Sequence, residues 1–212
     1  MKLFLASSLD KTLHLLAGIA GIVPSETKVA FIANAADPYT GDKQWGEKIW
    51  VKDDKKKFQE LGYIVSDIDL EDMDADLLEE SLVEFDIIHI CGGNALYFIR
   101  LLQRKGLSEI FKKIIIEKIY TGTSAGSMIA APSLEIEKYS DEAKPEILAE
   151  LENFKGLGLV DFLIMPHSNN KDFKEDFTRY IDHLSEYKDP LIFLYDNQVV
   201  WVEDGSMKIL HA

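Results

Sequence analysis

Cysteine is almost absent from the sequence, because Cys91 is the only one among 212 residues. A lone cysteine cannot form a disulfide within the chain, and it fits a reducing compartment. A chain of this length can bury a substantial hydrophobic core without disulfides or metals. The hydrophobic fraction of 47% and the charged fraction of 28% are those of an ordinary globular protein. We therefore expect one soluble domain spanning residues 1–212.

Positive charge and long hydrophobic runs are also scarce. The chain has 23 lysines and arginines against 37 aspartates and glutamates, which gives a formal net charge of -14. Such a surface repels nucleic-acid phosphates and anionic lipid headgroups. No apolar stretch approaches the ~20 residues that a membrane-spanning helix needs, and the opening segment lacks the apolar region of a signal peptide. We expect a cytoplasmic protein that binds neither nucleic acid nor membranes, whereas the sequence does not indicate an oligomeric state.

Short β-branched apolar runs alternate with longer amphipathic stretches along the chain. This alternation predicts an α/β fold, in which an open and mostly parallel sheet carries helices on both faces. The expected strands are Lys2–Ala6, Lys28–Ile32, Tyr63–Asp67, Ile87–Cys91, Lys118–Gly122, Leu163–Pro166, Leu191–Tyr195 and Val199–Val202. The expected helices are Asp10–Ala20, Gly41–Leu61, Asn94–Lys105, Leu107–Ile116, Ala125–Ala131 and Asp172–Ser185.

Two further features complete the predicted organisation. Asp196 and Asn197 favour a turn between the last two expected strands, so we expect a C-terminal β-hairpin that ends near Asp204 and Gly205. Residues 132–155 carry many charges and two prolines without a clean period, which predicts an excursion over the surface.

The segment GTSAG at residues 122–126 closes an expected strand and opens an expected helix. Small residues around a serine in such a turn hold it on a tight bend and expose its hydroxyl. The helix that follows would aim its N-terminus at a developing oxyanion. Ser124 is therefore the candidate nucleophile, although short Gly-x-Ser-x-Gly matches also occur in turns that merely require small residues.

A second turn, Cys91-Gly92-Gly93-Asn94, lies between another expected strand and helix. Glycines let backbone amides approach a ligand without interference from side chains. Because ligands of parallel sheets bind beyond the carboxyl ends of the strands, both turns should border one crevice. We predict that the amides of Gly92, Gly93 and Ala125 form an oxyanion hole. Asn94 is the candidate substrate-binding residue, and the alternative is an ordinary helix-entry turn.

His167 follows the strand expected at Leu163–Pro166, so it should stand at the same edge of the sheet. A histidine with an ordinary pKa near ~6.5 can take a proton from a serine at neutral pH. His167 is therefore the candidate general base, with a helix-capping histidine as the alternative. His89 is expected in the core, whereas His14 and His183 are expected on helix surfaces. No pair of histidines has metal-ligand spacing, and we expect neither a metal nor another cofactor.

A serine–histidine pair also needs an acid that fixes the tautomer of the imidazole. Asp196 directly follows the strand expected at Leu191–Tyr195, which makes it the best-placed candidate. Asp141, Glu135 and Glu137 lie in the charged segment after the serine and are its rivals.

Three segments together resemble the aspartyl dipeptidase (dipeptidase E) and cyanophycinase family of serine peptidases. They are GTSAG at residues 122–126, CGGN at 91–94, and GLGL at 156–159 followed by Pro166-His167. The resemblance implies a sheet similar to that of class I glutamine amidotransferases, a serine on a nucleophile elbow, and a histidine after GLGL. Ser124 and His167 fall on those positions. The family acid is a glutamate in a late strand-turn segment, where this chain has Asp196, and Cys91 replaces a frequent third glycine.

Acyl transfer is the predicted reaction. His167 would deprotonate Ser124, the serine would attack a peptide carbonyl, and water would hydrolyse the acyl-enzyme. The resemblance implies a serine-type exopeptidase acting on small peptides, with N-terminal aspartate as the candidate specificity. An acidic substrate would need a positive partner, for which Arg100, Arg104, Arg179 or a lysine are open candidates.

Two other interpretations remain open on the sequence alone. An α/β-hydrolase of esterase type also uses Gly-x-Ser-x-Gly, but its chain order of serine, acid and histidine would require Asp141 or a neighbour. A non-catalytic protein of the same fold could hold a small metabolite in a crevice with exposed amides.

Overall fold

A computed structural model of the protein describes residues 1–41 and 46–212. Within these ranges the main sheet has seven strands in the order β3-β2-β4-β5-β1-β8-β9, and β6 and β7 form a separate two-stranded sheet. The strands are β1 (Lys2–Ala6), β2 (Lys28–Ile32), β3 (Ile64–Ile68), β4 (Ile87–Ile90), β5 (Ile119–Thr123), β6 (Leu163–Met165), β7 (Leu191–Phe193), β8 (Gln198–Glu203) and β9 (Ser206–His211).

Helices connect the strands and vary widely in length. The α-helices are α1 (Leu9–Thr12), α2 (Leu16–Ala20), α3 (Ile49–Glu60), α4 (Ala75–Leu82), α5 (Ala95–Arg104), α6 (Ser108–Ile116), α7 (Ala125–Met128), α8 (Pro145–Leu148) and α9 (Lys174–His183). Short 3₁₀ turns are η1 (Leu13–Leu15), η2 (Pro24–Glu26), η3 (Asn34–Tyr39), η4 (Leu70–Asp72), η5 (Glu135–Tyr139), η6 (Lys171–Phe173) and η7 (Leu184–Glu186).

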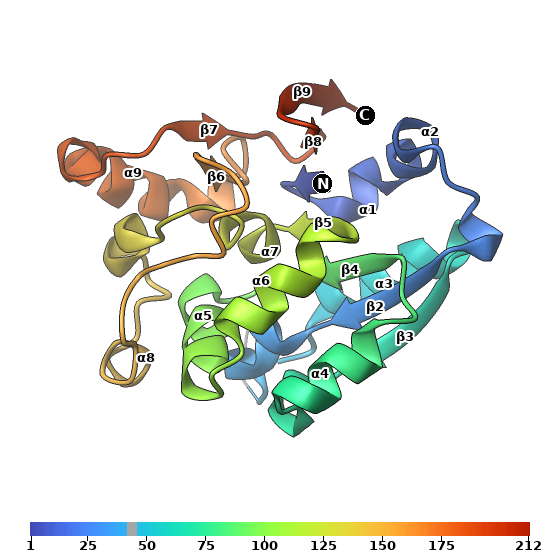
Figure 1. The fold of residues 1–212 in the computed structure, drawn as a ribbon. Helices are drawn as coiled ribbons and strands as arrows, with labels where there is room; N and C mark the ends of the chain where they lie inside the picture. The colour runs from blue at the N-terminus through green and yellow to red at the C-terminus, as the bar shows by residue number, and fades with distance from the viewer. Residues whose placement is uncertain (42–45) are drawn as a thin grey trace.

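The first five strands of the main sheet run parallel, and β8 and β9 add an antiparallel edge. Alternate residues of a strand face opposite sides of a sheet. Leu3 and Leu5 of β1 accordingly pack into one hydrophobic core, whereas Phe4 and Ala6 pack into the other. The first core lies under α4, α5, α6 and α7, and the second lies under α1, α2 and α3 (Figure 1). The predicted α/β fold with helices on both faces is confirmed.

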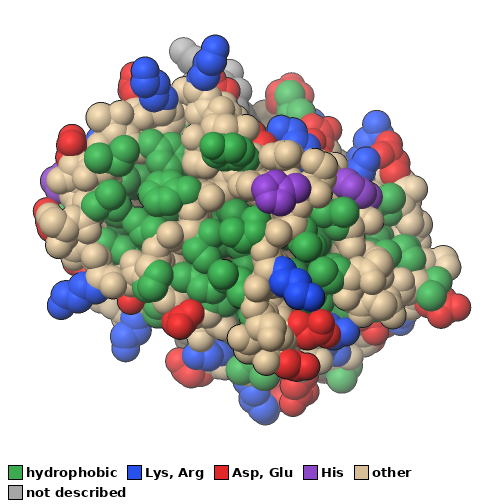
Figure 2. Space-filling view, turned by 90° about the horizontal axis from the view of Figure 1, so that it is seen from above, with side chains coloured by type: hydrophobic (Ala, Val, Ile, Leu, Met, Phe, Trp, Pro, Cys, Tyr) green, Lys and Arg blue, Asp and Glu red, His purple; other side chains and the backbone are tan. Residues whose placement is uncertain are grey.

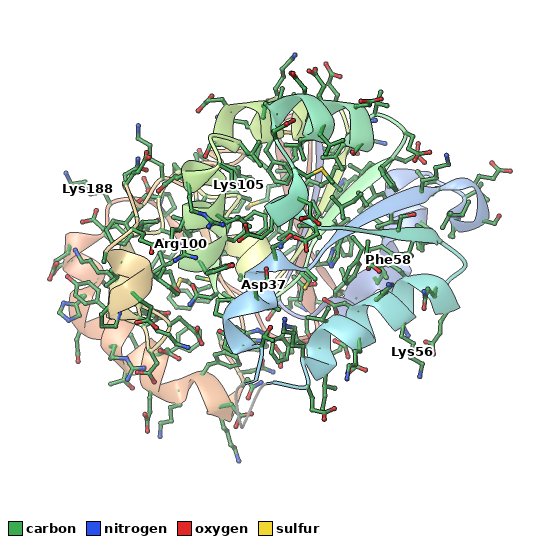
Figure 3. All side chains as sticks on the ribbon, turned by 90° about the horizontal axis from the view of Figure 1, so that it is seen from below. Asp37, Lys56, Phe58, Arg100, Lys105 and Lys188 are labelled. Carbon is green, nitrogen blue, oxygen red and sulfur yellow. The ribbon has the colours of Figure 1, made fainter. Side chains whose placement is uncertain are left out.

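Helix α3 illustrates how a helix covers the sheet. Phe58 is fully buried and points toward the sheet, whereas Lys56, two residues earlier, points away from it (Figure 3). This helix begins only at Ile49, so the prediction of a helix from Gly41 to Leu61 is too long. Lys48 at its start has a φ of 47°, which is incompatible with a continuing helix, and residues 42–45 of the prediction lie outside the described residues.

The C-terminal hairpin is present, but its turn lies elsewhere than predicted. Strand β7 pairs with β6 and not with β8, so Asp196 and Asn197 do not join two paired strands. The hairpin consists of β8 and β9 around Asp204 and Gly205, whose φ angles of 49° and 78° suit a two-residue turn. The hairpin was predicted to end near Asp204 and Gly205, but these residues form its turn. Strand β9, which follows them, was not predicted.

Several exposed hydrophobic side chains lie on β7, on β9 and in the loop after β7. They are Phe193, Tyr195, Met207 and Ile209, each at least 43% exposed. Figure 2 shows hydrophobic side chains gathered on the face of the molecule where these strands lie. None of the helices in the described ranges has the length and apolar character that crossing a membrane requires.

Candidate active site

Three parallel strands end side by side and define one edge of the sheet. Strand β5 lies between β1 and β4, so Ser7, Ser124 and the turn after β4 follow neighbouring strand ends. Helix α7 also packs against β6, which brings the small sheet to the same edge (Figure 1). Ligands of parallel sheets bind beyond such carboxyl ends. The predicted site residues therefore converge in the expected place.

Ser124 stands on a tight bend between β5 and α7. Its φ of 49° and ψ of -114° form a conformation that residues other than glycine rarely adopt. The backbone N–H of Ser124 donates to the carbonyl oxygen of Ala6 at 3.0 Å, which ties the bend to β1. A Cβ atom on Gly126 would lie 2.0 Å from the carbonyl oxygen of Ile90, so only glycine lets α7 approach β4 this closely. This geometry is that of a nucleophile elbow.

The side chains of Ser124, His167 and Asp196 form one hydrogen-bonded series. The Oγ atom of Ser124 lies 2.9 Å from Nε2 of His167. The Nδ1 atom of His167 lies 2.6 Å from Oδ1 of Asp196. An ionised carboxylate only accepts hydrogen bonds, so Nδ1 carries the proton and Nε2 is free to accept from the serine hydroxyl. The series therefore has the protonation that general-base activation of a serine requires.

Several contacts hold the histidine and the carboxylate in place. The ring of His167 stacks on Phe173 with centroids 4.4 Å apart. Hydrogen bonding from His167 is the main factor that lowers the pKa of Asp196 to about 2, and the nearby positive charge of Lys11 lowers it further. Oδ2 of Asp196 lies 3.5 Å from Nζ of Lys11. Asp196 is consequently ionised throughout the neutral range.

The turn after β4 borders the serine. A Cβ atom on Gly92 would lie 3.3 Å from Cβ of Ser124, so the two bends are in near contact. The carbonyl of Gly92 accepts from the indole N–H of Trp50 at 3.1 Å, which fixes the orientation of the turn. Within the described ranges, the N–H groups of Gly92, Gly93 and Ala125 donate to no other residue. They are available to an oxygen atom bound beside Ser124.

The sequence and the fold agree with one family of peptidases. Residues 3–210 match the sequence model of Peptidase family S51. The chain belongs to this family. Among curated proteins, an uncharacterized peptidase of Pasteurella multocida is 31% identical over 185 residues, which cover 87% of this chain and 85% of that protein. Peptidase E of a Nostoc species is 33% identical over 147 residues, 69% of this chain and 54% of that protein.

Solved structures support the same assignment. A putative peptidase E protein from Listeria monocytogenes matches all of this chain and 98% of its own, with 25% identity and a TM-score of 0.84. A peptidase from an acI-B1 Actinobacterium shares the fold, with 17% identity and a TM-score of 0.66. The predicted family resemblance is therefore confirmed, and the protein is a peptidase E-like hydrolase. Asp196, whose carboxylate bonds to the imidazole, follows His167 along the chain, whereas the acid of an α/β-hydrolase precedes its histidine.

The rival acids lie apart from the histidine of this peptidase. Asp141 pairs with Arg179 at 2.8 Å, and Glu135 pairs with Lys138 at 3.1 Å. Glu137 is buried, and desolvation raises its pKa to about 8 despite a hydrogen bond from Tyr180. Of the four carboxylates considered from the sequence, Asp196 is thus the one bonded to the imidazole.

Asn94 is fully buried, and the protein occupies both ends of its amide. Its Oδ1 atom accepts from the backbone N–H of Tyr97 at 2.8 Å and caps α5. Its Nδ2 atom donates to Oε2 of Glu142 at 3.0 Å. A direct contact with substrate would require one of these bonds to break, so the structure gives this side chain a positioning role behind the turn.

The arginines proposed as partners of an acidic substrate are engaged in ion pairs. Arg100 contacts Glu150 at 2.9 Å and Arg179 contacts Asp176 at 2.6 Å. Arg104 contacts both carboxylate oxygens of Glu71, at 2.5 and 2.6 Å. A substrate carboxylate would have to compete with these partners.

Sequence reasoning missed three residues that support the site. Ser7 contacts both His167 and Asp196. Phe173 stacks on the imidazole, and Trp50 bonds to the Gly92 carbonyl. Only Ser7 gave a usable signal, because it directly follows a predicted strand that was expected to end at the same edge.

Proposed function

We propose that this peptidase is a serine-type exopeptidase that hydrolyses small peptides through an acyl-enzyme. The observation that supports the proposal most strongly is the series of two hydrogen bonds, 2.9 Å from Ser124 to His167 and 2.6 Å from His167 to Asp196. In this proposal Ser124 is the nucleophile, His167 is the general base, and Asp196 orients the imidazole.

The proposed reaction begins when Nε2 of His167 takes the hydroxyl proton of Ser124 as the oxygen attacks the peptide carbonyl. Negative charge then develops on the carbonyl oxygen, and the N–H groups of Gly92, Gly93 and Ala125 stabilise it. The imidazolium returns its proton to the leaving amine. A water molecule, deprotonated by the same imidazole, hydrolyses the ester and restores the serine. Asp196 remains ionised and stabilises the imidazolium in both steps.

Labelling of the serine tests the chemistry directly. A fluorophosphonate probe should react with the wild-type protein and should not react with Ser124→Ala. Labelling of His167→Ala should be slower by about 10³-fold or more, since the serine loses its base. If well-folded wild-type protein is not labelled and hydrolyses no peptide, the proposal is wrong and a binding function is favoured.

The proposed specificity is a dipeptidase activity on peptides with an N-terminal aspartate, which rests on the family resemblance. A panel of dipeptides that differ only in the first residue measures it through kcat/KM. Asp-Ala should be hydrolysed at least about tenfold better than Asn-Ala, which has the same shape without the charge. Hydrolysis of other peptides with Asp-Ala untouched would reject the specificity and retain the serine chemistry.

A further inference from the structure

Ser7 is the residue outside the predicted set that contacts the site most directly. It follows β1, its side chain is fully buried, and it lies 160 residues from His167 in the sequence. Its Oγ atom accepts from the backbone N–H of His167 at 2.8 Å. The same atom donates to Oδ1 of Asp196 at 3.1 Å. One hydroxyl therefore joins the base and the acid independently of the bond between them.

The direction of these bonds follows from their partners. A backbone N–H can only donate, so Ser7 accepts from His167 and has its single proton for the carboxylate. Oδ1 of Asp196 then receives two donors, from Ser7 and from Nδ1 of His167. Two donors on one oxygen define the plane and rotation of the carboxylate more tightly than one. The Oδ2 atom faces Lys11 at 3.5 Å and Asn170 at 3.5 Å.

The backbone of His167 needs such support. Its φ of 61° lies in the left-handed region, which residues other than glycine rarely occupy. Conformations of this kind persist where the surrounding structure fixes them. Ser7 fixes the N–H of His167, and the carbonyl of Leu194 fixes the N–H of Ser168 at 3.0 Å. The rotation of this backbone segment determines where the imidazole points.

The neighbouring residue holds the nucleophile. The carbonyl oxygen of Ala6 accepts from the N–H of Ser124 at 3.0 Å and from Oγ of Ser127 at 2.7 Å. Ala6 and Ser7 together therefore contact all three residues of the hydrogen-bonded series. The distance between nucleophile and base is set at the end of one strand.

We propose that Ser7 is a positioning residue of the active site, which holds the carboxylate of Asp196 and the backbone of His167 so that the imidazole faces Ser124. This inference rests on the proposed function, because positioning matters only if the series performs catalysis. Ser7 does not touch the substrate. Its loss should therefore slow the chemical step and leave the binding of substrate unchanged.

Kinetics of three variants test the inference on the peptide that the wild type hydrolyses best. Ser7→Ala should lower kcat by about 10- to 100-fold with KM within about twofold, since a small misplacement of catalytic groups has an effect of this size. Ser7→Thr, which keeps the hydroxyl, should retain more activity than Ser7→Ala. Ser8→Ala is the matched control, because the exposed Ser8 hydroxyl bonds only locally to Asp10 at 2.6 Å, and its kcat should equal that of the wild type.

A measurement without turnover separates this inference from the proposed function. The Nδ1 proton of His167, bonded to a carboxylate, should give a downfield proton resonance that disappears in His167→Ala. Ser7→Ala should shift or broaden it. Ser7→Cys, which fills the space with a weak donor, should do the same and serves if Ser7→Ala unfolds. An unchanged resonance, or a kcat within about threefold of wild type, would overturn the role of Ser7. A wild-type protein that is neither labelled nor active would instead reject the proposed function.

Discussion

Asp196 owes its place in the site to contacts from four directions. His167 and Ser7 donate to one of its oxygens, Lys11 faces the other, and its own N–H donates to the side chain of Asn169 at 3.0 Å. The contacts of the carboxylate with His167, Lys11 and Ser7 favour its charged form and lower its pKa to about 2, with the bond from His167 as the largest cause. A carboxylate that stays ionised in the neutral range keeps the proton of the neutral imidazole on Nδ1.

Replacement of this carboxylate by an amide of the same shape should disturb the hydrogen bond to Nδ1 of His167 and, through the tautomer of the imidazole, the bond from Nε2 to Ser124. We expect Asp196→Asn to lower kcat by about 10³- to 10⁴-fold, because an amide N–H facing Nδ1 favours the wrong tautomer. Asp141→Asn is the matched control, since Asp141 pairs with Arg179 at the surface, and its kcat should stay within about twofold. Steady-state kinetics on one dipeptide measures both. Equal losses in the two variants would remove Asp196 from its proposed role.

Much of the site could be predicted at the scale of single residues, because Ser124, His167 and Asp196 each follow a recognisable strand. The predicted strand before Ser7 could place this residue at the same edge, but not its contacts, since Ser7 and Ser8 look alike in the sequence. Only the pleat and register of β1 turn Ser7 into the site and leave Ser8 beside Asp10. Ser7 and Asp196 are 189 residues apart, so no local sequence pattern indicates their contact.

Among the elements, the turn between β4 and α5 is tightly constrained by backbone geometry. Gly93 has a φ of 150°, and a Cβ atom built on it would lie 2.2 Å from the carbonyl oxygen of Ala35. The N–H of Asn94 also donates to that carbonyl at 2.8 Å, so the turn and η3 lie in direct contact. A side chain on Gly93 would push this turn, which carries the N–H groups of Gly92 and Gly93, away from η3.

We expect Gly93→Ala to lower the free energy of unfolding by about 3 kcal/mol or more, because backbone atoms cannot yield to the new methyl group. Gly62→Ala is a matched control. Gly62 also has a positive φ, of 91°, but a Cβ there meets nothing within 4 Å, so the loss should be about 1–2 kcal/mol. Urea denaturation followed by circular dichroism measures both. Similar losses would show that φ alone, and not the contact with Ala35, constrains the turn.

The order of strands and helices along the chain could be predicted from the sequence more reliably than the pairing of the strands. The sequence pattern identified the five parallel strands, because most of them are short apolar runs between turn residues. The pairing of β6 with β7 was not visible, since each has only three residues and pairs with the other outside the main sheet. Helix α4 was missed because it has only eight residues, of which Leu78 and Leu82 alone are buried, so it shows little periodicity.

For the whole molecule, three buried titratable groups contribute to the dependence of stability on pH. Asp54 and Glu137 are almost completely buried, and desolvation raises the pKa of each to about 8. His89 is fully buried, and desolvation lowers its pKa to about 3. Between pH 6.5 and 8 the folded state therefore holds protons on two carboxyls that the unfolded state has released. At these two carboxyls the unfolded state binds fewer protons, so their contribution to stability falls as the pH rises through this range.

We expect the free energy of unfolding to decrease from pH 6.5 to 8 with a slope of up to about 1.4 kcal/mol per pH unit for each buried carboxyl. Glu137→Gln removes one titrating group and keeps its shape, so its slope should be about half that of the wild type. Urea denaturation at pH 6.5, 7 and 8 measures both slopes. The exposed Glu152→Gln is the control and should leave the slope unchanged. A Glu137→Gln slope equal to that of the wild type would assign the effect to other groups.

The position of β1 between β5 and β8 has a consequence for folding during synthesis. Strand β1 is synthesised well before β8, which is one of its two neighbours in the sheet. Ser124, the proposed nucleophile, is synthesised 43 residues before His167 and still longer before Asp196. While the chain is still growing, Ser124 is already present but His167, which would activate it, is not. In the proposed function, hydrolytic activity would arise only after the segment that carries Asp196 has folded beside β1, so a nascent chain could not cleave itself or its neighbours earlier.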